Sequence, residues 1–93
     1  MDKVEERIKK LEENQLKMAK EFGKQGVAFY LTLAGMRVAS LGAEKYKEYE
    51  KYMRDSMDKA NKQIGNAKDV DKVLTLADKF TDDCIKYTES QFK

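Results

Sequence analysis

Apolar side chains recur every three or four residues through the first 22 positions of the chain. They stand at Val4, Ile8, Leu11, Met18 and Phe22, and Gln15 is the one polar residue in the series. This spacing places all of them on one face of an α-helix and is typical of a coiled-coil seam. A helix of this length is marginal in water by itself, so we expect the seam to pack against another segment or another copy. We call this set the N-terminal seam.

The N-terminal seam predicts self-association but leaves its stoichiometry open. Gln15 can specify the register of a coiled coil, yet it does not by itself decide between two, three or four strands. Acidic and basic residues four positions apart, such as Glu5 and Lys9, support the outer face of the same helix. We therefore expect a homo-oligomer of undetermined size.

Two glycines follow the seam and predict a hinge. Gly23 and Gly26 bracket a two-residue spacer, and each glycine is less favourable in a helix than alanine by about 1 kcal/mol. We expect the first helix, residues 1–22, to bend or end here. A second, longer helix is expected at residues 26–64.

The first part of that second helix, residues 27–43, is the least polar segment of the chain, and Arg37 is its only charge. Its length is at the short limit for a membrane span and the charge lies near its middle, which disfavours a transmembrane helix. Two interpretations remain: a helix buried at the centre of a bundle, or one that lies against an apolar body. The side chains expected to contact such a body are Phe29, Tyr30, Leu33, Met36, Val38 and Leu41.

The second half of the chain predicts two amphipathic helices joined by a tight turn. Residues 44–64 carry one apolar stripe, and residues 67–92 carry another that includes Leu74 and Cys84. Gly65 and Asn66 predict the stop between them, with Asn66 also capping the next helix. A short connection favours an antiparallel hairpin. The chain is thus expected to be a single all-α domain, residues 1–93, of two or three helices.

Composition agrees with long helices and narrows the classes of function. The chain is 39% charged and lacks proline and tryptophan, as in helical proteins. Lys and Arg number 19 against 17 Asp and Glu, and the signs alternate, so no basic face for nucleic acid is expected. Cys84 is the only cysteine and no signal-peptide pattern opens the chain. We therefore expect a cytoplasmic protein.

No arrangement of residues predicts catalysis. Histidine is absent, which removes the commonest general base and metal ligand. Asp69, Asp71, Asp82 and Asp83 stand among lysines on a charged face, and Cys84 lies on an apolar stripe, where a small core residue is expected. Neither a phosphate-binding loop nor a metal-ligand spacing occurs. We expect no enzyme activity, no cofactor and no metal.

Two stretches together resemble the phasins, proteins that coat polyhydroxyalkanoate storage granules. In the second half, an Ala-Lys-Asp-hydrophobic motif opens a helix and a Leu-x-x-x-Phe spacing follows: Ala67, Lys68, Asp69, Val70, then Leu76 and Phe80. In the apolar segment, Leu33, Ala34 and Gly35, then Leu41, Gly42 and Ala43, are similar to the Leu-Ala-Gly-Leu-Gly-Ala region of granule-associated phasins. The resemblance covers about two thirds of the chain.

The resemblance implies a non-enzymatic protein that covers the granule surface, limits granule coalescence and influences the enzymes that make or degrade the polymer. The chain departs from the family in being short and poor in glutamine and alanine, and it lacks the Lys- and Ala-rich tail that would hold DNA. Surface coating is therefore the implied role. Two other classes stay open: a coiled-coil scaffold or adaptor for protein partners, and a helical protein associated with a membrane surface.

Overall fold

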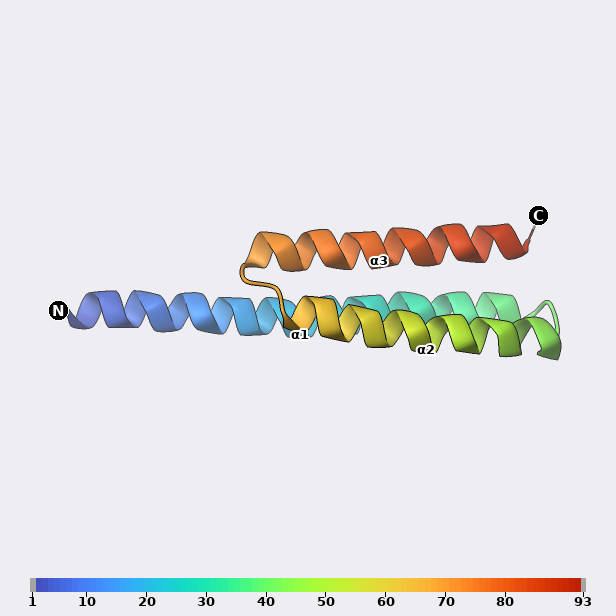
Figure 1. Cartoon of the computed structure of the whole chain (residues 1–93), viewed down its shortest axis with the longest axis horizontal. Coiled ribbons are helices and arrows are strands. Elements are labelled where there is room, and N and C mark those ends of the chain that lie inside the picture. Colours follow the sequence, from blue (N-terminus) through green and yellow to red (C-terminus); the bar gives the residue numbers. More distant parts are fainter. Residues whose placement is uncertain (1, 93) are drawn as a thin grey trace.

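Residues 2–92 of the computed structural model form three α-helices: α1 (Lys3–Ala39), α2 (Ala43–Gly65) and α3 (Val70–Gln91). Consecutive helices run antiparallel, so α3 lies parallel to the second half of α1 (Figure 1). The molecule is elongated, with extents of 62 × 17 × 16 Å. The all-α class and the antiparallel packing expected from the sequence are confirmed.

The helix boundaries correct two expectations. α1 continues without interruption through residues 23–26, so the predicted hinge is wrong. A Cβ at Gly23 would lie 3.1 Å from Cγ1 of Val73, so this glycine lets α3 approach α1 closely. The chain turns instead between α1 and α2, at residues 40–42, where Gly42 has φ 113°. Glycine adopts such an angle without steric penalty, so the single helix expected at residues 26–64 is broken there.

The second turn, residues 66–69, also differs in detail from the expected one. Asn66 ends α2 with a right-handed backbone and does not cap α3. Asp69 is the N-cap, because its carboxylate accepts a hydrogen bond of 2.8 Å from the backbone amide of Lys72. The capping residue therefore stands three positions later than predicted, and α3 begins at Val70.

The core fills the space between the second half of α1 and the other two helices. Its buried side chains include Val27, Leu31 and Val38 of α1, Tyr49 and Ile64 of α2, and Val73, Phe80 and Cys84 of α3. The small residues of α1 make room for large ones of α2. A Cβ at Gly35 would lie 3.0 Å from Cε1 of Tyr49, so glycine is what allows that ring to reach α1.

A polar contact lies inside this core. The hydroxyl of Tyr49 donates a hydrogen bond to the backbone carbonyl of Leu31 and lies 3.8 Å from Sγ of Cys84. Burial of the phenol raises the pKa of Tyr49 well above its ordinary value, with a further contribution from Cys84. Tyr52 and Tyr87 stack beside it, with ring centroids 3.9 Å apart. Cys84 is thus the small core residue that its position predicts.

The first part of α1 extends beyond the other two helices (Figure 1). Every residue from Asp2 to Gln15 is exposed. We call residues 3–15 the arm. At its base, Nζ of Lys20 donates a hydrogen bond of 2.8 Å to the carbonyl of Gly65, the last residue of α2. This bond satisfies a carbonyl that the end of α2 leaves without an intrahelical partner.

Candidate apolar binding faces

The N-terminal seam is exposed along its whole length. Val4, Ile8, Leu11, Met18 and Phe22 are each 49% to 66% exposed, although large apolar side chains are most often buried. Covering them would stabilise the covered state by about 1 kcal/mol per side chain, since full burial of such residues is worth about 1.5 to 3 kcal/mol.

A second set of exposed apolar side chains lies on the part of α1 that belongs to the bundle. Phe29, Tyr30, Leu33 and Met36 are exposed, and Leu41 is exposed in the turn that follows. The rings of Phe29 and Tyr30 meet edge to face, with centroids 6.4 Å apart. Five of the six side chains expected to contact an apolar body are therefore accessible.

Val38 is the exception, and it leaves the candidate set. Its side chain is 0% exposed and belongs to the core, together with Leu31 and Ala34. The reason is helical geometry: Val38 is seven residues after Leu31, so both point to the same side of α1, toward α2 and α3. Phe29 and Met36, also seven residues apart, point away from that side.

Helix α3 and its end add Ile85 and Phe92, which sequence reasoning missed, and Leu74, which was expected on the apolar stripe of this helix. Leu74, Ile85 and Phe92 are exposed and stand 11 and 7 residues apart, so they share one side of α3 or its end. Leu74 was expected on the buried stripe, but Leu76 is buried instead. The spacing of 11 and 7 residues was the available signal. Together with Phe29, Tyr30, Leu33, Met36 and Leu41, these three residues make up what we call the bundle face.

An open groove joins the α1 and α3 parts of the bundle face. It has a volume of about 210 Å³ and is lined by Tyr30, Leu33, Ala34, Arg37, Cys84, Ile85 and Thr88. The hydroxyl of Thr88, a residue that lines the groove, already has a hydrogen-bond acceptor, because its Oγ1 donates to the carbonyl of Cys84 at 2.7 Å. At one end the guanidinium carbon of Arg37 lies 5.0 Å from the ring centroid of Phe92. The groove therefore offers mainly apolar contact area with one cation beside it.

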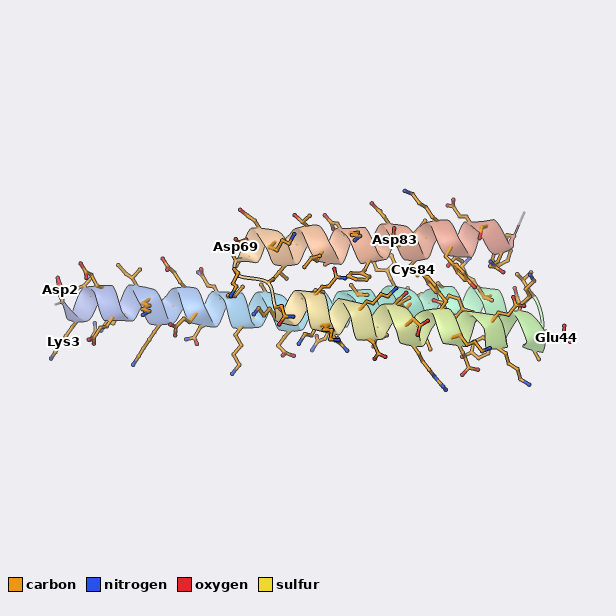
Figure 2. All side chains as sticks on the ribbon, viewed as in Figure 1. Asp2, Lys3, Glu44, Asp69, Asp83 and Cys84 are labelled. Carbon is orange, nitrogen blue, oxygen red and sulfur yellow. The ribbon has the colours of Figure 1, made fainter. Side chains whose placement is uncertain are left out.

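The carboxylates of α3 do not assemble into a site. Asp69 caps the helix, and Asp83 stands well along it on the outside, next to the inward Cys84 (Figure 2). Among residues 2–92, no group of three or more Cys, Asp or Glu side chains could hold a metal ion. No helix in the same part of the chain is long and apolar enough to cross a membrane.

The candidate functional surface thus consists of two apolar faces, the N-terminal seam and the bundle face, which share one uninterrupted helix. Comparisons with protein-family models, with curated proteins and with solved structures find no match to this chain.

Proposed function

We propose that this protein binds an apolar surface through the bundle face and acts without catalysis, as a phasin-like coat of polyhydroxyalkanoate granules. The observation that carries the proposal is the spread of exposed apolar side chains across two packed helices, with Leu33 of α1 and Ile85 of α3 lining one groove. Extended apolar patches on a soluble fold are typical of interaction surfaces.

The arrangement supports binding without unfolding. Residues of α1 that hold the bundle together, such as Leu31, point inward, while Phe29 and Met36 point outward from the same helix. Contact with an apolar body would therefore leave the core contacts in place. The gain is about 25 cal/mol for each Å² of apolar surface removed from water.

The aromatic residues of the bundle face suit the boundary between polymer and water. Tyr30 is 45% exposed and combines an apolar ring with a hydroxyl that can stay hydrated. Arg37 stands beside Phe92 and can lay its aliphatic stem along the surface while its charge remains in water. Coating of this kind would place charged side chains of α2 outward and limit granule coalescence.

Co-sedimentation with artificial polyhydroxybutyrate granules tests the proposal. The wild-type protein is compared with a Leu33→Asp, Ile85→Asp double variant, which adds two charges to the groove of the bundle face. A Gln63→Asp, Thr75→Asp double variant is the matched control, since both positions are exposed and it changes net charge equally. Binding by the wild type and the control, and loss of binding in the groove variant, is the expected result.

Phospholipid vesicles in a parallel assay separate polymer from membrane surfaces. Preferential binding to vesicles would replace the granule with a membrane surface as the target. Absence of binding to both would contradict the bundle-face proposal. It would favour a scaffold or adaptor for protein partners, for which the exposed N-terminal seam is the supporting observation.

A further inference from the structure

The arm is a helix with no buried residue, although one side of it lines an open groove with Lys68, Asp69 and Val70 at the start of α3. Every residue from Asp2 to Gln15 is exposed, and the first core residue of α1 is Val27. An isolated helix segment of this length is marginal in water, because few of its residues gain from packing. A partner along the seam would supply the missing contacts, and the pattern of the seam indicates which partner.

The seam follows the heptad repeat of a coiled coil. Ile8, Gln15 and Phe22 occupy one of its two core positions, named a, and Val4, Leu11 and Met18 occupy the other, named d. In the heptad of Ile8 and Leu11, a β-branched residue at a meets leucine at d, the combination that favours two parallel strands. A polar residue at a single a position sets the register when it can pair with its own copy. Gln15 meets this requirement only if two identical chains align in parallel.

Charges beside the seam favour the same alignment. In a parallel pair, Arg7 would lie beside the partner's Glu12 on both sides of the seam, an attractive arrangement at positions that set partner choice. An antiparallel pair centred on the N-terminal seam would instead bring Glu12 to the partner's Glu12 and place Gln15 on the partner's Leu11. A longer antiparallel overlap along all of α1 would bring Glu21 to the partner's Glu21.

We propose that a second copy of this chain covers the N-terminal seam, forming a parallel, in-register two-stranded coiled coil from Val4 to Phe22. Beyond Phe22 the a positions stay apolar, at Phe29 and Met36, but the d positions become polar, at Gln25 and Thr32. The two-position apolar repeat of the seam therefore ends at Phe22, and we place the end of tight pairing there. Both bundles then lie at the same end of the paired arms.

Light scattering coupled to gel filtration tests the stoichiometry. We expect the wild type to reach the mass of a dimer as concentration rises. Leu11→Asp is expected to weaken association by about a hundredfold or more, because two charges would enter the paired seam. Thr75→Asp, an exposed position on α3, is the matched control and keeps the wild-type dissociation constant. Circular dichroism verifies that the bundle of each variant remains folded.

Disulfide trapping tests the direction of the strands. Gln15→Cys is expected to form a disulfide-linked dimer under mild oxidation, since the parallel register brings the two side chains together. Glu13→Cys, on the outside of the arm, should not be trapped, and the buried Cys84 of the wild type should not react. A monomer at all concentrations, a larger oligomer, or a dimer that Gln15→Cys does not trap would each overturn the proposal. None of these measurements involves a granule, so they fail or succeed independently of surface binding.

Discussion

The two parts of α1, the arm and the segment packed in the bundle, are one continuous helix in opposite environments. Leu11 in the arm is 60% exposed, whereas Leu31 in the bundle is 1% exposed. The bundle part carries apolar residues on two sides, with Leu31 and Val38 inward and Phe29 and Met36 outward, while the arm carries a single apolar side. The difference shows that a helical repeat identifies an apolar face without identifying what covers it.

The largest expected effect comes from making the same substitution in each part. Leu31→Ala should lower the free energy of unfolding by about 2 to 5 kcal/mol, because it leaves a cavity in the core. Leu11→Ala should change it by less than about 0.5 kcal/mol at concentrations where the chain is monomeric. Urea denaturation followed by circular dichroism measures both. Equal losses would mean that the arm packs against the bundle.

Two glycines of α1 also lie in different surroundings. Gly35→Ala should destabilise the bundle by about 1 to 2 kcal/mol, because the new Cβ would press on the buried ring of Tyr49. Gly26→Ala should stabilise it by up to about 1 kcal/mol, since a Cβ there meets nothing within 4 Å and alanine favours the helix. Thermal denaturation compares the two. A stabilising Gly35→Ala would show that Tyr49 moves aside easily.

Alkaline pH distinguishes the buried tyrosine from an exposed one. The unfolded chain loses the phenolic proton of Tyr49 near pH 10, while the native chain keeps it because burial raises its pKa. The free energy of unfolding should therefore fall as pH rises above about 10 and show no such contribution below it. Tyr49→Phe should remove this part of the slope and lower stability at neutral pH by about 1 kcal/mol.

Tyr30→Phe is the control for this measurement, because Tyr30 lies on the bundle face and the substitution leaves Tyr49 in place. Urea denaturation at a series of pH values should give the wild-type slope for this variant. An unchanged slope in Tyr49→Phe would assign the alkaline sensitivity to other groups.

At the junction of arm and bundle, a side-chain hydrogen bond of Lys20 is expected to make a modest contribution to stability. Lys20→Ala removes the hydrogen bond to the carbonyl of Gly65 and should destabilise the bundle by about 0.5 to 1.5 kcal/mol. Lys17→Ala, an exposed position one turn earlier, should have no measurable effect. Chemical denaturation of the two variants under identical conditions checks the difference. Equal stabilities would show that water replaces the lysine at this carbonyl.

Periodicity predicted much of this fold because each buried stripe follows from helical geometry. Residues 44–64 were predicted to carry one apolar stripe, and the buried residues of α2, Tyr49, Ala60 and Ile64, lie on one side of that helix. The helix ends were harder, because they depend on single backbone angles. Gly42 breaks the helix with a positive φ, whereas Gly23 and Gly26 remain inside α1, and composition alone does not separate these cases.

The bundle face was predicted in part for a related reason. Phe29, Tyr30, Leu33 and Met36 follow from the apolar character of one segment, but Val38 in the same segment is buried. Ile85 and Phe92 belong to the bundle face because α3 packs beside α1, and this packing does not follow from the sequence of either helix alone. A surface built from two helices depends on their mutual rotation, which neither helix encodes separately.

Because α1 has no break, the number of residues between the N-terminal seam and the bundle face fixes the angle between these two faces around the helix axis. At 3.6 residues per turn, each residue between Phe22 and Phe29 sets 100° of rotation between the N-terminal seam and the bundle face. Inserting one residue there would swing the two faces apart by about 100° without altering either of them. Seven inserted residues would nearly restore the angle and add only about 10 Å of length. The number of residues between the two faces therefore determines which way the bundle face points when the N-terminal seam is bound to a partner.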